Sequence, residues 1–294
     1  MGQPMKTDLP RSALFMPGSN QRAIDKVPSL DCDAVILDLE DAVAPSAKDL
    51  ARVTIRAALA QPRSEGFGAR LVAVRTNDLD ALGFAADLDA AQGADVIVVP
   101  KVSSVQELAA CQAALSAIGS TAQLWVMIET AEGVLNIREI ARQAATVAPS
   151  LSALIIGAND LAKDTGAAQV EGRWTMVPWF AEIVLAASAA GLGVLDSVSN
   201  AFRDLDAFAA ECAQGAALGM VGKTLIHPAQ IEPCNRAFGP KAVDIERAQA
   251  IVSAFNDLHN ADKGAVQIAG EMVERLHLDG AQEVLRRATA LGLI

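Results

Sequence analysis

The chain has 294 residues, 52% of them hydrophobic, which suits either one barrel-sized domain with an appendage, our expectation, or two smaller domains. Its formal net charge of −11 argues against a nucleic-acid partner, because a phosphate backbone would repel an acidic protein. The N-terminus lacks the apolar core of a signal peptide, and no apolar run reaches the roughly 18 residues of a membrane span, so we expect a cytoplasmic protein without a membrane partner.

Short runs of Val, Ile and Leu alternate with Ala-rich helical stretches along most of the chain. The candidate strands are residues 13–16, 33–38, 70–75, 95–100, 124–129, 153–157, 193–198 and 219–226. Eight such alternations in about 230 residues are typical of a (β/α)8 TIM barrel, which we place at residues 1–235. A doubly wound sheet is the alternative, but it would usually have fewer strands and a Gly-rich phosphate-binding fingerprint, which is absent.

Residues 236–294 form a C-terminal helical extension after the barrel. Two amphipathic stretches, 242–261 and 272–291, are separated by the sequence DKGAVQIAG. One face of each stretch is too apolar to remain in water, so we expect the extension to pack on the barrel or on a neighbouring subunit.

Two basic residues follow the first strand in the sequence PGSNQRAIDK. Arg22 and Lys26 are spaced i, i+4, so they share one helix face and could bracket a phosphate or diphosphate group. A solvated basic face is the alternative, and from these residues alone it is favoured because exposed Lys/Arg pairs are common.

Acidic residues gather where the second strand ends, in LDLEDAV. Asp38, Glu40 and Asp41 need a compensating cation, arginine or water, since crowded carboxylates repel one another. Arg75 ends the third strand and could hold a substrate carboxylate with its planar fork, or neutralise these acids, or do both. We expect Lys101, after the fourth strand, to be a surface or ion-paired lysine.

The fifth and sixth candidate strands each deliver an acid at the carboxyl end, Glu129 in IETAEGV and Asp160 in GANDLA. Ligands and metals are held at that end of a parallel barrel, and two carboxylates could bind Mg2+ while leaving positions for water and substrate. Helix capping is the alternative for both residues.

Together these segments resemble the citrate lyase beta subunit and malyl-CoA lyase family. The likeness is carried, in the family's order, by RSALFMPGSN, DAVILDLEDAV, VRTN, VPKV, IETAEGV, GANDLA, LDSV and GKTLIHPAQI. It implies a (β/α)8 barrel, Mg2+ with Mn2+ as an alternative, thioesters of CoA or acyl carrier protein, and homotrimers or hexamers in which the C-terminal segment closes over a neighbour's site.

The resemblance also assigns roles by position. Glu129 and Asp160 match the metal ligands, and Arg75 matches the clamp for the substrate carboxylate. Arg22 and Lys26 match positions that meet the CoA phosphates, which reverses the reading from the residues alone. The predicted CoA contacts are completed by three residues of GKTLIHPAQI, namely Ile226, His227 and Pro228.

The chain departs from the family pattern at two positions, and it lacks a feature of a related branch. Glu274, in GEMVE, stands where the family usually has an aspartate that reaches the adjacent active site as an acid/base. The longer side chain moves the carboxyl group by about a bond length, which matters in a site that needs sub-ångström placement. Asn159 stands where many relatives have an acid, and LEDAV lacks the histidine of the related class II aldolases.

The sequence therefore predicts a Mg2+-dependent carbon-carbon lyase that splits a 3-hydroxyacyl-CoA, such as citramalyl-CoA or malyl-CoA, into acetyl-CoA and pyruvate or glyoxylate, or runs the reverse condensation. Arg75 would hold the carboxylate, Glu274 of a neighbouring chain would exchange the proton, and Glu40 and Asp41 would support Arg75 and the metal's water. The alternatives are a citryl-carrier-protein lyase that yields oxaloacetate, a malyl-CoA thioesterase, and a non-catalytic interaction subunit.

Overall fold

The computed structural model describes residues 9–257, 260 and 263–294, which divide into two compact units. The first unit ends at Phe238, and the second is Gly239–Ile294. None of the described helices is both long and apolar enough to cross a membrane.

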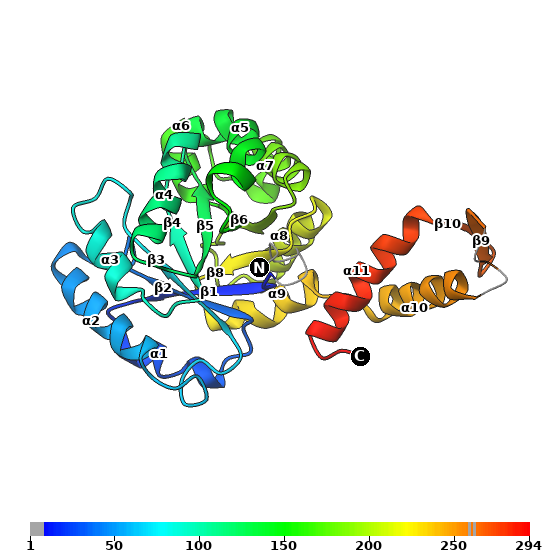
Figure 1. The fold of residues 1–294 in the computed structure, drawn as a ribbon, viewed down its shortest axis with the longest axis horizontal. Coiled ribbons are helices and arrows are strands. Elements are labelled where there is room, and N and C mark those ends of the chain that lie inside the picture. The colour runs from blue at the N-terminus through cyan, green and yellow to red at the C-terminus, as the bar shows by residue number, and fades with distance from the viewer. Residues whose placement is uncertain (1–8, 258–259, 261–262) are drawn as a thin grey trace. The chain divides into compact units, whose positions relative to one another are not determined.

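Parallel strands close into a barrel in the first unit (Figure 1), and each pairs with the next along the chain until β8 pairs with β1. The strands are β1 (Ser12–Pro17), β2 (Ala34–Asp38), β3 (Leu71–Arg75), β4 (Val96–Val99), β5 (Gln123–Ile128), β6 (Leu151–Ile156), β7 (Gly193–Asp196) and β8 (Gly222–Leu225). The predicted (β/α)8 barrel is confirmed, and each observed strand overlaps its predicted segment.

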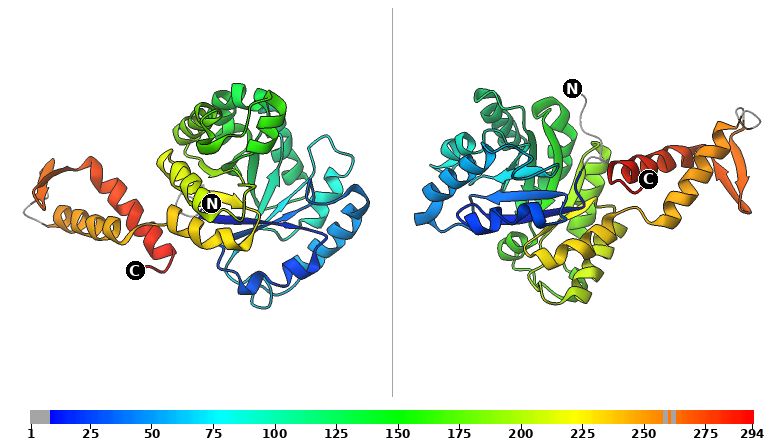
Figure 2. Two further views of the ribbon diagram at one scale, coloured as in Figure 1. Left: turned by 180° about the vertical axis from the view of Figure 1, so that it is seen from behind. Right: turned by 90° about the horizontal axis from the view of Figure 1, so that it is seen from below.

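Helices surround the barrel (Figure 2) and cover the outer face of its strands. They are α1 (Gln21–Ile24), α2 (Lys48–Leu59), α3 (Phe84–Ala90), α4 (Val105–Ala117), α5 (Ala131–Val147), α6 (Ala158–Thr165), α7 (Val177–Ala189), α8 (Leu205–Ala217) and α9 (Ile231–Phe238). Short 3-10 turns lie at Val27–Ser29 (η2), Pro45–Ala47 (η3), Glu171–Arg173 (η4) and Pro228–Gln230 (η5).

Most strands are apolar on both faces, because each lies between the barrel interior and the helical layer, and β8, with Lys223 and Thr224, is the exception. In β2, Ile36 joins the interior cluster while Val35 and Leu37 join the outer one. This alternation places the whole of each strand out of water, so polar side chains concentrate where the strands end. At the carboxyl ends of β2 and β3, Asp38 and Arg75 are register partners.

The second unit consists of α10 (Ala242–Asn256), the antiparallel hairpin β9 (Ala265–Ile268) and β10 (Glu271–Glu274), and α11 (Leu276–Ala290). The expected helices are present, but the segment predicted to begin at residue 272 starts as a strand. Ala269 and Gly270 connect the strands, both with positive φ (49° and 90°), which suits the tight turn of a hairpin. That turn ends the helical pattern and places Glu274 at the end of β10.

Candidate active site

The end of β3 carries a buried arginine whose donors are occupied by acids from β2 and the loop after it. Arg75 donates from Nε and Nη2 to the two carboxylate oxygens of Asp38, both at 2.7 Å, and its Nη1 lies 2.6 Å from Glu40 Oε2. Its guanidinium also stacks 4.7 Å above the Phe15 ring. These contacts hold the planar fork in one orientation, as binding of a substrate carboxylate requires.

Lys101 joins this cluster to the next strand. Its backbone is in the left-handed conformation (φ 56°), which residues other than glycine rarely adopt. In that conformation its backbone N–H donates to Glu129 Oε1 at 3.0 Å, and its ammonium group lies 2.5 Å from Glu40 Oε1 and 3.3 Å from Asp78. Burial alone would lower the pKa of Lys101, but its bond to Glu40 raises it, so the lysine stays charged.

Glu129 follows β5 and is only 1% exposed. Burial, followed by the nearby charges of Glu40 and Asp160, raises its pKa to about 8. A Cβ atom on Gly157 would stand 2.1 Å from Glu129 Oε2, so only glycine leaves room for the carboxylate there. The carboxylate is thus desolvated beside other acids, and a cation would relieve that repulsion.

Asp160 supplies the second predicted metal ligand from the first turn of α6, which begins directly after β6. It is half-buried and close enough to Glu129 to raise that residue's pKa, and its carboxylate has no hydrogen bond to another described residue. No group of three or more His, Cys, Asp or Glu among the described residues is arranged to hold a metal. Two carboxylates with open positions nevertheless fit Mg2+, which usually keeps several waters and is bound by one or two carboxylates.

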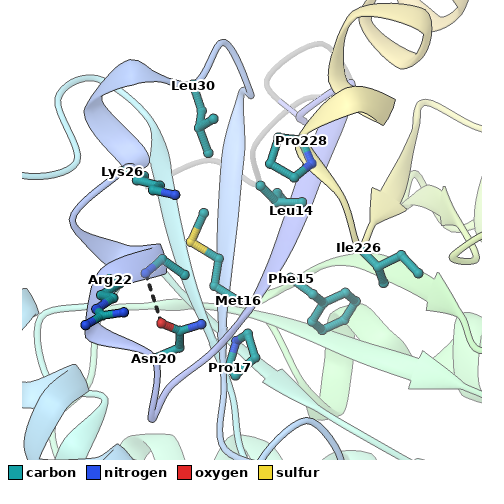
Figure 3. A pocket seen from close by; sticks show the side chains of 11 residues that line it. Leu14, Phe15, Met16, Pro17, Asn20, Arg22, Lys26, Leu30, Ile226 and Pro228 are labelled. Atoms are coloured by element: carbon teal, nitrogen blue, oxygen red, sulfur yellow. Dashed lines mark hydrogen bonds between the residues drawn. The ribbon is translucent and has the colours of Figure 1, made fainter. Parts of the chain in front are cut away.

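Predicted CoA-binding residues converge on a pocket of about 510 Å3 between β1, α1 and the turn after β8 (Figure 3). Arg22 and Lys26 lie on one wall, with Ile226 and Pro228 on the opposite side. Phe15 lines the pocket too, and its ring also lies beneath the Arg75 guanidinium. Phe15 therefore belongs both to the wall of this pocket and to the surroundings of Arg75.

Three other predicted residues are placed differently. His227 accepts a hydrogen bond from the Ala229 backbone and stacks on Phe202 at 4.8 Å, and it is not among the residues that line the pocket. Asp41 is exposed and makes no hydrogen bond to another described residue. Glu274 belongs to the second unit, so its participation in the site stays a prediction.

The sequence analysis counted Asp38 among the acids that Arg75 could neutralise and expected a surface or ion-paired Lys101, and both ion pairs are present, but it assigned neither residue a role in the site. Asp38 could have been identified from strand register, because aligning the carboxyl ends of β2 and β3 sets it beside Arg75. No sequence signal could have identified the role of Lys101. Its contacts depend on a positive φ angle, which the presence of a lysine does not predict.

Comparisons with known proteins identify the family of the chain. The family described as HpcH/HpaI aldolase/citrate lyase matches residues 11–228. A (3S)-malyl-CoA thioesterase of Cereibacter sphaeroides is 40% identical, covering 96% of this chain and 95% of its own. The human mitochondrial citramalyl-CoA lyase is 30% identical, and the match covers 96% of this chain and 86% of the lyase.

Among solved structures, the CitE protein of Mycobacterium tuberculosis, in complex with magnesium, acetoacetate and coenzyme A, is similar with a TM-score of 0.73 and 28% identity. The similarity covers 95% of this chain and 97% of that one. The family match at residues 11–228 spans all eight barrel strands. The chain therefore belongs to the HpcH/HpaI aldolase/citrate lyase family of enzymes.

Proposed function

We propose that this protein is a Mg2+-dependent enzyme that acts on a CoA thioester of the malyl-CoA class. The observation that carries the proposal is the shared position of Phe15, which lines the pocket of Arg22 and Lys26 and also supports the Arg75 guanidinium. A CoA thioester has phosphates at one end and, in this class, a carboxylate at the other. Here Arg22 and Lys26 would meet the phosphates and Arg75, on the other side of Phe15, would meet the carboxylate.

Glu129 and Asp160 would hold the metal, which, when bound, supplies positive charge that polarises a coordinated hydroxyl or carbonyl oxygen. Arg75 would bind the terminal carboxylate, and its bidentate partner Asp38 would keep its fork in position. Lys101 would maintain Glu40 and Glu129 in place through its side chain and its backbone N–H. Glu274 of a neighbouring copy would carry the proton.

Thioester hydrolysis is the first candidate reaction, because the 40% identical relative is a malyl-CoA thioesterase and matches almost the full length of both chains. Water would add to the thioester carbonyl, and the C–S bond would break to give free CoA and the hydroxy acid. Carbon-carbon cleavage is the second candidate, favoured by the citramalyl-CoA lyase at 30% identity. That reaction yields acetyl-CoA and a keto acid.

Product analysis separates the two reactions. Purified protein would be incubated with malyl-CoA or citramalyl-CoA, with Mg2+ or with excess chelator, and CoA species and acids would be quantified by chromatography. Free CoA with malate, formed only with Mg2+, supports hydrolysis. Acetyl-CoA with glyoxylate or pyruvate supports cleavage, and absence of both product pairs would refute the proposed function.

A further inference from the structure

A second cavity of about 500 Å3 lies at the same rim of the barrel, lined by the segments that follow β6 and β7. Its walls come from the first turn of α6, the loop after β7, the segment around η4 and the start of α8. Asn159 lines this cavity, whereas its chain neighbour Asp160 is a proposed metal ligand. Successive helical residues point about 100° apart, so one turn of α6 serves both the metal position and this cavity.

The cavity contains a buried polar group that has no partner. Ser197 is 1% exposed and lines the cavity, and its hydroxyl oxygen makes no hydrogen bond within the described part of the chain. A buried hydroxyl without a partner costs free energy comparable with a lost hydrogen bond. The Ser197 hydroxyl is therefore available to bond a polar group of a ligand.

The cavity's only cationic side chain among the described lining residues is already neutralised. Arg173 donates from Nη1 to both carboxylate oxygens of Asp196, at 2.8 and 3.0 Å, and from Nε to Gln214 at 2.9 Å. Lys223, which is fully buried, adds a further contact of 2.9 Å to Asp196. Glu211 lies 3.4 Å from Lys223, so these two cations and two acids balance, and the lining acids left over are Glu171 and Asp204. An anionic group would thus meet repulsion there.

Neutral amides form the part of the wall next to the metal position. Asn159 Oδ1 accepts hydrogen bonds from Gln169 at 2.9 Å and from Asn200 at 2.8 Å. The amide of Asn159 also donates to Asn200 Oδ1 at 3.3 Å. An acid at position 159 would receive the same bonds but would add charge, so the amide keeps this wall uncharged.

We infer that this cavity is the subsite for the substituent on the hydroxyl-bearing carbon of the substrate, and that it selects an uncharged substituent able to bond the Ser197 hydroxyl. The inference rests on the proposed function, because the metal on Asp160, the chain neighbour of Asn159, would hold the substrate hydroxyl beside this cavity. It assigns substrates with a hydrogen, methyl or hydroxymethyl group on that carbon and excludes those with a carboxymethyl group, as in citryl thioesters.

Binding of keto acids tests the inference without requiring turnover. Titration calorimetry with Mg2+ present would compare pyruvate, hydroxypyruvate and oxaloacetate, which differ only in a methyl, hydroxymethyl or carboxymethyl group. We expect hydroxypyruvate to bind most tightly and oxaloacetate at least about tenfold more weakly than pyruvate, because of charge repulsion. Oxaloacetate binding as tightly as pyruvate would overturn the inference.

Two variants locate the effect. Ser197→Ala is expected to raise the Kd for hydroxypyruvate by about three- to tenfold, the value of one hydrogen bond, and to leave the Kd for pyruvate unchanged. Asn200→Lys is expected to strengthen oxaloacetate binding relative to pyruvate binding by about tenfold, because it adds a cation to the wall of the cavity. The matched controls are Ser64→Ala and Gln61→Lys, exposed positions on the loop after α2.

The outcomes remain distinct from a failure of the proposed function. If no thioester is turned over but the keto acids bind in the expected order, the subsite inference is supported and the proposed reaction is refuted. If thioesters are turned over but Ser197→Ala changes pyruvate and hydroxypyruvate equally, the cavity is not the subsite.

Discussion

Arg75 and Asp38 form a two-bond ion pair, 2.7 Å on each bond, between side chains that are 10% and 0% exposed. Asp38→Ala would leave the guanidinium buried with Glu40 as its remaining described acid partner, so we expect unfolding by denaturant to show a loss of about 3–5 kcal/mol. The loosened fork should also lower kcat/KM by about 100-fold in protein that is still folded, since small misplacements of a binding group have effects of this size.

Arg11 and Asp33 provide the matched control. They form the same two-bond geometry, at 2.8 Å on each bond, but with side chains that are 16% and 20% exposed. Asp33 directly precedes β2, at the end of the strand opposite Asp38. Asp33→Ala should destabilise the protein by about 1 kcal/mol and leave activity unchanged, because solvent screens a partly exposed pair. Equal stability losses in the two variants would contradict the role given to burial.

The raised pKa of Glu129 predicts how stability depends on pH without metal. The folded-state pKa is about 8, above the ordinary value of about 4.3, so the neutral form is favoured by folding. Its contribution to stability is complete below about pH 4.3 and is lost at about 1.4 kcal/mol per pH unit as pH rises to 8.

Thermal unfolding in chelator between pH 5 and 9 checks this. Glu129→Gln removes the titrating group, so the stability of this variant relative to the wild type should rise with pH. Glu132 is exposed, so the stability of Glu132→Gln should follow that of the wild type at every pH. Mg2+ should raise the stability of the wild type at alkaline pH but give little stabilisation to Glu129→Gln, which lacks a metal ligand. Parallel pH profiles of all three proteins would show that Glu129 does not titrate in this range.

The barrel could be predicted from the sequence because its signal repeats. Eight apolar runs with helical spacers have few other ways to bury both faces of each strand, and the strand ends then bring Arg75, Glu129 and Asp160 to one rim. Glu40 was likewise predicted correctly as a neighbour of Arg75.

What could not be predicted depended on local backbone geometry and on choices between neighbouring acids. Composition alone does not separate Asp38 from Asp41 in LDLEDAV, yet the last strand residue, Asp38, points to Arg75 and Asp41 faces solvent. In the tail, the apolar periodicity of residues 272–291 hid the strand Glu271–Glu274, because a turn with two positive φ angles overrides a helical pattern. The placement of the Glu129 carboxylate similarly depends on Gly157, because a side chain there would overlap it.

Gly157→Ala tests whether the space beside Glu129 matters for metal binding. The added methyl would lie 2.1 Å from Glu129 Oε2 and must displace the carboxylate. We expect the Kd for Mg2+ to rise by about 10–100-fold, as when a residue that positions a metal ligand is changed. Calorimetry with Mg2+ measures this, and Gly66→Ala, where the nearest atom is 3.7 Å away, should bind Mg2+ like the wild type. Normal Mg2+ affinity in Gly157→Ala would place the metal elsewhere.

Arg22 and Lys26 are expected to bind the phosphates of CoA from the edge of their pocket. Arg22→Ala and Lys26→Ala should each raise the Kd for CoA by about tenfold at low salt, the typical value of a bond to a charged group. The difference from the wild type should shrink at high salt, because exposed charges are screened. Arg142 is an exposed arginine on α5, and Arg142→Ala is the control. If Arg22→Ala and Lys26→Ala both bind CoA as tightly as this control, the pocket is not the CoA site.

Glu274 offers a test of whether the site is shared between copies of the chain. It ends β10 as an exposed residue, and its backbone N–H donates to His277 Nδ1 at 3.0 Å. If its carboxyl group transfers the proton, Glu274→Gln should lower kcat by about 100-fold or more while CoA still binds. Arg75→Ala should be inactive for a different reason, since it loses the carboxylate clamp.

Mixing these two inactive variants, with subunit exchange, decides where Glu274 acts. When a site takes Arg75 from one chain and Glu274 from another, some mixed assemblies contain sites with both residues intact. An equal mixture should then recover up to about a quarter of wild-type activity, because each residue is intact in half of the chains. If Glu274 serves its own chain, every site carries one defect and no activity returns. The recovered rate therefore distinguishes a shared site from a self-contained one.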